Sequence, residues 1–297
     1  ENDSRSHKLQ RTLSGPRYLM IGFVLAFISS VFFSLYVVPR KLSKLKPLDF
    51  SLLMSIGFFT SSLLLYAFQP VLGFHETISP VLLWSLLAGA IWAASFITFV
   101  KAIDAIGLSR SNQWKNLQGP IAAVLSLIFL AEWQTTQPFF VLLAGLAIFA
   151  SALAFTISDS REQAKANMKG VYLATLAGVG FGTVAVIQKY VTTNVGVYSQ
   201  QVAWSFAIML SISLYILITG KKLPKPSLGN RDSRLALAAG LLYLGASFFQ
   251  LQSYKHLPAS IAFTVIQLNT IWTVGIGIIY FKEISVAKHY TRLLVGL

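Results

Sequence analysis

The sequence feature that most constrains this chain is a lysine inside a stretch that is long and apolar enough to span a membrane. The stretch runs from Gly107 to Trp133 and places Lys115 between Trp114 and Asn116, well away from either end. An ionisable side chain in hydrocarbon costs at least about 2.5–3.5 kcal/mol, so it is normally turned toward a protein interior or a wet cavity. We therefore expect Lys115 to lie at a polar site inside a bundle of membrane helices.

The composition agrees with a membrane protein. Of the 297 residues, 55% are hydrophobic and only 11% are charged, and the mean hydropathy of +0.66 is far above that of a soluble domain. The formal charge of +14 is spread over short basic clusters between apolar segments, which fits membrane loops better than nucleic-acid binding. There is no cysteine to form a disulfide or a thiolate metal site. We accordingly expect no nucleic-acid partner, no metal and no cofactor.

Stretches of the length needed to span a bilayer, about 20 mostly apolar residues, recur along the chain. They predict an all-α integral membrane protein with ten transmembrane helices, of which the tenth begins near Ile284 and is truncated at Leu297. No loop between them is long enough to form a separate domain. The other nine helices are expected at Tyr18–Val38, Phe50–Phe68, Pro80–Ile103, Gly107–Ala131, Pro138–Ile157, Gly170–Val191, Gln200–Thr219, Leu235–Tyr254 and Pro258–Phe281.

The second half of the chain repeats the first at an offset of 148 to 151 residues. The matched pairs include Gly22 with Gly170, Ala26 with Ala174, Phe33 with Phe181, Lys41 with Lys189 and Ala88 with Ala239. We therefore divide the chain into a polar N-terminal tail (1–17), a first five-helix repeat (18–157), a connecting loop (158–169) and an incomplete second repeat (170–297). Because five is odd, the second repeat enters the membrane from the opposite side. This predicts two inverted repeats with a site near the midplane between them.

The same offset pairs the polar centres of the fourth and ninth predicted helices. At 151 residues, Asn116 falls on Gln267 and Gln118 falls on Asn269. Lys115 falls on Ile266 and has no charged counterpart. The sequence thus predicts a polar centre that is symmetric in its amides and asymmetric in its charge.

These polar residues and the aromatic side chains near them form the predicted substrate site. The candidates are Lys115, Asn116, Gln118, Trp114, Gln267, Asn269, Trp272, Trp92, Tyr243 and Ser34. Lys115 is interpreted either as a fixed cation for a substrate carboxylate or phosphate, or as a group that releases a proton during transport. The structural alternatives are hydrogen bonding to carbonyl groups near Gly119 and Pro120, or snorkelling to the membrane surface. The amides alternatively join helices, and the aromatic rings alternatively serve only in packing.

Small residues and two acids have expected structural roles. The GVGFG run that begins at Gly178 permits close helix approach or a hinge, and Ser30 and Ser34 hold the equivalent places in the first helix. Glu132 and Glu283 end the equivalent fourth and ninth helices. We expect them to be interfacial caps or loop anchors rather than proton carriers.

Several local motifs resemble a known group of transporters. The stretch AIDAIGLSRSN followed by a span that ends in AEW, the basic segment SLYVVPRKLSKLK and the closing IIYFKE are similar to segments of the drug/metabolite transporter superfamily of EamA-like proteins. Within it, the chain resembles the glucose/ribose porter branch, which includes rhamnose-transporter-like proteins. The resemblance implies alternating-access transport of a small polar solute, often a sugar, coupled to protons or another ion. The lysine departs from that branch, and membrane-embedded lysines elsewhere in the superfamily bind phosphate-bearing sugars, so an anionic substrate is also implied.

The sequence favours a transporter over an enzyme. It has no HExxH, GxSxG or aspartate-rich diphosphate motif, and Asp104 stands alone at a helix boundary, so we expect no catalytic residue. We expect a secondary transporter of a sugar, sugar-like or anionic metabolite in the plasma or inner membrane, as a monomer or homodimer. An exporter of amino acids or drugs and a non-transporting receptor are the alternatives.

Two expectations about orientation conflict. Of the 24 Lys and Arg residues, 17 follow odd-numbered helices, which places both termini outside by the positive-inside rule. The family it resembles is drawn with both termini in the cytoplasm.

Overall fold

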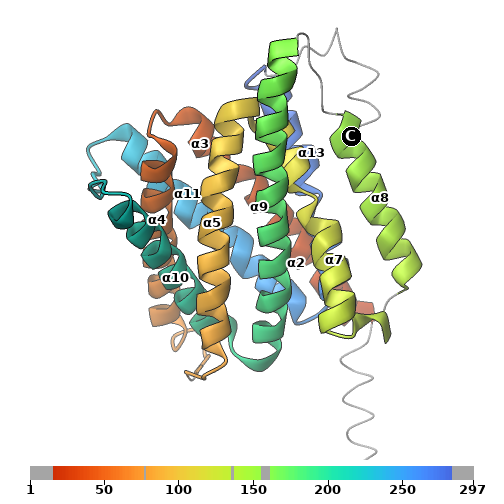
Figure 1. Ribbon diagram of the computed structural model, residues 1–297. Coiled ribbons are helices and arrows are strands. Elements are labelled where there is room, and N and C mark those ends of the chain that lie inside the picture. The colour runs from red at the N-terminus through yellow and green to blue at the C-terminus, as the bar shows by residue number, and fades with distance from the viewer. Residues whose placement is uncertain (1–15, 77, 135–136, 155–160, 283–297) are drawn as a thin grey trace, which may run out of the picture.

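The computed structural model describes residues 16–76, 78–134, 137–154 and 161–282, and every regular element within them is a helix (Figure 1). The tenth predicted helix and Glu283 lie outside these residues. In chain order the elements are α2 (Pro16–Leu35), α3 (Val38–Leu42), α4 (Pro47–Phe68), α5 (Leu82–Ile106), α6 (Leu108–Lys115), α7 (Gln118–Phe129), the 3₁₀ helix η1 (Glu132–Gln134), α8 (Pro138–Ala154), α9 (Arg161–Asn194), α10 (Val197–Ile218), α11 (Arg231–Tyr254), α12 (Ala259–Ile266) and α13 (Asn269–Ile279).

Seven helical stretches in the described part of the chain are long and apolar enough to cross a membrane. The outer surface agrees with that assignment, because large apolar side chains such as Ile128, Phe129 and Phe140 are 61–73% exposed on it. Such a surface is expected to face lipid. The chain is an integral membrane protein. The seven stretches are Pro16–Leu42, Pro47–Phe68, Leu82–Ile106, Met168–Asn194, Val197–Ile218, Arg231–Tyr254 and Ala259–Ile279.

Two predicted spans are each divided into two short helices. The fourth becomes α6 and α7, which meet near Asn116, and the ninth becomes α12 and α13, which meet near Gln267. Equivalent turns join the pieces. The amide of Gly119 donates to the Asn116 carbonyl at 3.0 Å, and that of Thr270 donates to the Gln267 carbonyl at 2.9 Å. Each break therefore places helix ends inside the bundle, as in the discontinuous helices that line transporter sites.

The helices pack so that α5 and α9 lie side by side, with α4 and α10 on one flank and α7 and α8 on the other (Figure 1). Helix α9 contacts α5, α6 and α7, while α2 contacts α11, α12 and α13. In the same way, the contact of α4 with α11 matches that of α10 with α5, and the contact of α6 with α13 matches that of α7 with α12. Each of these contacts has a counterpart when the helices of the first half are exchanged, in chain order, with those of the second half.

The contact of α9 with the α6–α7 break depends on glycine. A Cβ atom at Gly178 would lie 2.8 Å from the Lys115 carbonyl oxygen, closer than packed atoms allow. The close helix approach predicted from the GVGFG run is thus confirmed. In the other half, the equivalent contact of α2 with α13 uses a hydroxyl group instead, because Ser34 Oγ donates to the Asn269 carbonyl at 2.8 Å.

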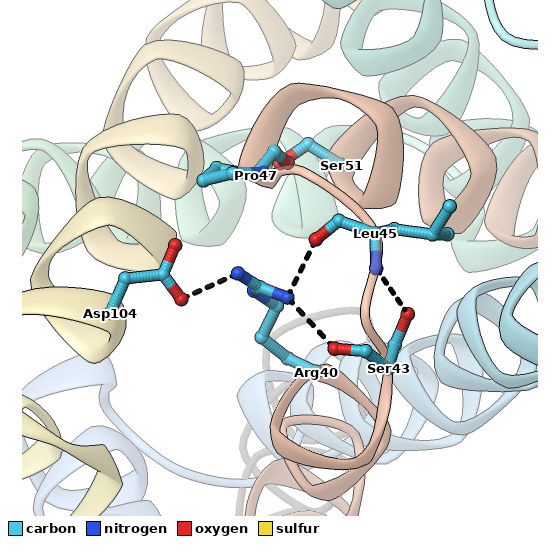
Figure 2. A network of polar contacts seen from close by, with 6 residues as sticks. All are labelled: Arg40, Ser43, Leu45, Pro47, Ser51 and Asp104. Atoms are coloured by element: carbon cyan, nitrogen blue, oxygen red, sulfur yellow. Dashed lines mark hydrogen bonds and ion pairs between the residues drawn. The ribbon is translucent and has the colours of Figure 1, made fainter.

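Arg40 of α3 bonds to Asp104 and to two residues of the α3–α4 connection (Figure 2). Its Nη2 donates to Asp104 Oδ1 at the end of α5, at 2.5 Å, and its Nη1 donates to the carbonyl oxygens of Ser43 and Leu45 at 3.4 and 3.1 Å. The Arg40 side chain is only 8% exposed, whereas that of Asp104 is 41% exposed. Asp104, which stands alone in the sequence, therefore forms an ion pair that joins α5 to the α3–α4 connection.

Helix α9 begins inside the stretch assigned above to the connecting loop. Its first residue is Arg161, and the segment REQAKANMK that follows is rich in Glu, Gln, Ala and Lys. These residues favour a helix even when they are too polar for a membrane span. The hydropathy pattern locates the apolar part of α9 and not its polar first turns.

Candidate functional site

A cavity lies in the interior of the bundle, beside the α6–α7 and α12–α13 breaks. The space between its walls is about 430 Å³, counting space that is open to the surroundings, and only a small part of it is wide enough for a water molecule. Helices α2, α5, α6, α7, α9, α10, α11 and α12 all contribute to its lining. Both halves of the chain therefore form this cavity, in the place where the sequence predicts a substrate site.

Aromatic rings form much of the cavity wall. Tyr243 of α11 lies among them, with its ring centroid 4.8 Å from that of Trp92, 5.0 Å from that of Tyr36 and 5.8 Å from that of Trp204. Trp92 in turn stacks on Phe96 at 4.6 Å. The aromatic residues that line the cavity are Phe33, Tyr36, Trp92, Phe181, Trp204, Tyr243 and Phe263.

Lys115 is buried and lines this cavity, with an exposed fraction of 2%. Its Nζ lies 5.5 Å from the centroid of the Phe99 ring, a distance at which an ammonium group interacts favourably with the ring face. Gln118 follows three residues later and lines the same cavity. The lysine thus lies in the protein interior and not on the lipid-facing surface.

Two further amides line the cavity, and they are partly satisfied by neighbours. Gln250 Nε2 donates to the Tyr254 hydroxyl at 2.6 Å, and the side-chain oxygen Oε1 of Gln188 accepts a hydrogen bond from Gln200 Nε2. Two buried donors of lining residues, Gln188 Nε2 and Trp204 Nε1, have no hydrogen-bond partner among the described residues. The cavity therefore presents donors that a ligand with oxygen acceptors can satisfy.

The amides predicted to be equivalent differ in their contacts. Gln118 lines the cavity, but Asn116 and Asn269 bond to neighbouring helices outside it. Asn116 Nδ2 donates to Asn269 Oδ1 at 3.4 Å and also to Thr270 Oγ1. Gln267 lies with Asn116 in a separate pocket next to α8. Of the four amides, Asn116 and Asn269 therefore join helices, whereas the side chain of Gln267 has no hydrogen-bond partner among the described residues.

The remaining candidates also divide between the cavity and its surroundings. Trp92 and Tyr243 line the cavity, whereas Trp114 packs edge-on against Phe149 of α8 with ring centroids 6.3 Å apart. Trp272 is 40% exposed on the outside of α13. Ser34 is buried and bonded to Asn269, as described above.

Sequence reasoning missed several lining residues, of which Gln188 and Gln250 are the most informative. Each interrupts an otherwise apolar stretch of a span, in α9 and α11 respectively. That is the same signal that selected Gln118. Tyr36 and Trp204 were also missed, because an aromatic residue in an apolar span gives no sign of which face it occupies.

Glu132 of η1 caps a helix of the other half of the chain. Its carboxylate accepts hydrogen bonds from the Ala259 amide at 2.7 Å, from the Ser260 amide at 3.0 Å and from the Ser260 hydroxyl at 2.7 Å. These groups lie at the N-terminus of α12, where a negative charge is favourable. The predicted capping role is confirmed for Glu132.

A wider polar pocket of about 1150 Å³ lies next to the cavity, along α9 and α11. Thr192 and Tyr254 line it, and each lies one helical turn beyond a residue that lines the cavity, Gln188 and Gln250 respectively. Lys189 lines the pocket as well. Lining residues of the pocket and of the cavity are therefore neighbours along α9 and α11.

The corner between α11 and α12 lies close to this pocket and holds a histidine. The ring of His256 lies 4.2 Å from that of Tyr18, centroid to centroid, and the Tyr18 hydroxyl donates to the Lys255 carbonyl at 2.6 Å. Partial burial, together with the charge of Lys255, lowers the pKa of His256. The folded protein therefore favours the neutral imidazole.

Comparison with known proteins decides the family. Residues 65–297 match the model of the Sugar_transport family, described as sugar transport protein. The chain belongs to this family. The cavity described above therefore lies in a member of a family of sugar transport proteins.

Individual relatives of this sugar transport family member carry related names. A probable glucose uptake protein GlcU of Bacillus cereus is 22% identical over 288 residues, which cover 94% of this chain and 95% of that protein. A probable glucose uptake protein GlcU of Staphylococcus aureus is 24% identical and covers 76% and 78% of the two chains. A solved crystal structure aligns with a TM-score of 0.61 over 95% of this chain and 96% of its own, at 14% identity, which shows a shared fold.

Proposed function

We propose that this protein is a secondary transporter that moves a sugar across the cell membrane by alternating access, with the central cavity as its binding site. The observation that carries the proposal is the cavity itself, which combines aromatic walls with amide side chains in the interior of a membrane protein of the sugar transport family. The names of the relatives support a hexose as substrate.

The cavity chemistry suits a sugar ring. The C–H faces of a pyranose are apolar and pack on aromatic rings such as Trp92 and Tyr243, while its hydroxyl groups need donors and acceptors. Gln118, Gln188 and Gln250 supply both kinds of group from three different helices. A ligand held by amides on α7, α9 and α11 contacts both halves of the chain at once.

Alternating access requires two halves that move relative to one another. The exchange of contacts between the first and second halves, and the broken helices in equivalent places, support the inverted five-helix repeats predicted from the sequence. They equally support the proposed place among EamA-like drug/metabolite transporters. In this proposal the wider polar pocket along α9 and α11 is the approach to the site from one side of the membrane, and the Arg40–Asp104 pair holds the opposite end closed.

Flux measurements on purified protein in proteoliposomes test this function. We expect uptake of radiolabelled sugars. Repeating the measurement with and without a pH gradient across the membrane shows whether sugar uptake is coupled to protons.

Trp92→Ala should lower uptake at least about tenfold, because it removes a buried aromatic side chain from the wall of the site. Trp84→Ala is the matched control, since Trp84 lies on the same helix but is 49% exposed. Flux of amino acids or drugs without sugars would favour the exporter, and no flux of any solute would favour a receptor.

A further inference from the structure

The charge of Lys115 is the strongest unexplained feature of the cavity. The side chain is 2% exposed and lines the cavity, yet a neutral sugar has no group that needs a cation. A buried ammonium group without a counter-charge is costly, so a lysine placed here requires a physical reason.

No acidic side chain of the described residues lines the cavity. Three of the described carboxylates have other partners instead. Asp104 pairs with Arg40, Glu132 caps α12, and Glu76 accepts hydrogen bonds from the amide and hydroxyl of Ser199 at 2.8 and 3.0 Å. The cavity therefore holds a cation for which the described part of the protein provides no anion.

The helix that carries the lysine provides only part of the compensation. Lys115 is in the last turn of α6, where the carbonyl end of the helix favours a positive charge. The Phe99 ring face adds a further favourable contact. Both interactions hold the ammonium group in place, but neither neutralises it.

The other unsatisfied polar groups of the cavity are donors too. Gln188 Nε2 and Trp204 Nε1 are buried without partners in the described residues. Together with the Lys115 ammonium they form a set of donors that matches a ligand rich in oxygen acceptors and negatively charged.

We propose that the substrate is a sugar acid, a hexuronate or an aldonate, whose carboxylate pairs with the Lys115 ammonium while its hydroxyl groups bond to the cavity amides. The inference rests on the proposed function and narrows its substrate class. A carboxylate carries one negative charge and is balanced by one lysine. A phosphate carries about two near neutral pH and would leave an uncompensated negative charge in the interior, since no arginine lines the cavity in the described part of the chain.

Ligand binding to the purified protein in detergent, followed by tryptophan fluorescence, tests the inference. The probes are glucuronate, its uncharged methyl ester, glucose and glucose 6-phosphate. We expect glucuronate to bind at least about 30-fold more tightly than the methyl ester, since removing one partner of a buried charge pair typically has at least that effect. In Lys115→Gln the two should bind about equally. Lys101→Gln, the same change at an exposed lysine of α5, should leave the preference intact.

Each contrary result has a distinct meaning. Equal affinity of the wild type for glucuronate and its ester would overturn the inference and leave sugar transport standing, and so would a Lys115→Gln variant that keeps the preference. Tighter binding of glucose 6-phosphate would overturn the choice of a singly charged ligand. If no sugar of any charge binds or is transported, the proposed function itself fails. Because the ligand comparison in the wild type is informative alone, the test does not depend on the variant folding.

Discussion

The two broken helices, α6–α7 and α12–α13, occupy equivalent places in the fold but differ in chemistry. At the offset of 151 residues Lys115 corresponds to Ile266, and both line the cavity. Of the amides that the two helices share, Asn116 and Asn269 join helices, whereas Gln118 lines the cavity. Among the positions compared, shared amides join the two broken helices at Asn116 and Asn269, and the charge at Lys115 is the chemical difference between the helices that reaches the cavity.

The largest expected effect comes from making the residues at the equivalent positions 115 and 266 identical. Lys115→Ile places isoleucine at both equivalent positions and removes the only charged group of the described cavity lining. Uptake of a sugar acid into proteoliposomes should fall at least about 30-fold, because the substrate carboxylate loses its counter-charge. Ile266→Val, a small change at the equivalent position of the other broken helix, should alter uptake less than about threefold. Wild-type uptake by Lys115→Ile would show that the difference between the two positions has no role in transport.

The cap of α12 provides the next test, because it fixes one broken helix from the opposite half of the chain. Glu132→Ala leaves the amides of Ala259 and Ser260 without their acceptor and should lower the free energy of unfolding by about 2–3 kcal/mol. Thermal unfolding in detergent, followed by tryptophan fluorescence, measures this. Ser126→Ala removes only one of the bonds to Glu132, of 3.1 Å, and should cost about 1 kcal/mol. Equal effects of the two variants would refute the capping role.

The packing of each broken helix against its neighbour offers a smaller contrast. Gly178→Ala forces a Cβ atom against the Lys115 carbonyl and should cost about 1–3 kcal/mol. At the equivalent place in α2, Ser30→Ala removes a hydroxyl that donates to the Phe27 carbonyl at 2.7 Å, for about 0.5–1.5 kcal/mol. The same unfolding measurement compares the two. A Gly178→Ala protein as stable as the wild type would mean that α9 does not need glycine at this contact.

The smallest expected effect concerns the corners that precede the two broken helices. The corner before α12 holds His256, and the corresponding residue before α6 is Ala105. Burial and Lys255 lower the pKa of His256, so the folded state resists its protonation and stability declines as pH falls below about 6.5. His256→Gln should reduce the loss of thermal stability between about pH 7.5 and pH 5.5. An identical pH dependence in both proteins would exclude this histidine as a contributor.

Sequence reasoning identified the membrane class, the positions of most spans and the buried lysine, because hydropathy and the cost of an intramembrane charge act locally. It did not determine which candidates share the cavity. Lipid and neighbouring helices both accept apolar and aromatic groups, so Trp92 faces the cavity and Trp272 the outside with no difference in local sequence. The break after α6 also separates Asn116 from Gln118, and only the latter lines the cavity.

We propose that the cavity between the broken helices binds the transported sugar, and substrate protection of a single cysteine tests this most directly. The chain has no cysteine, so Ala185→Cys places the sole thiol on the cavity wall. Thr193→Cys in the adjoining polar pocket is the control. We predict that saturating sugar slows modification of the Ala185→Cys thiol at least about fivefold and leaves that of Thr193→Cys unchanged. Equal modification rates of Ala185→Cys with and without a sugar that the protein transports would contradict the account.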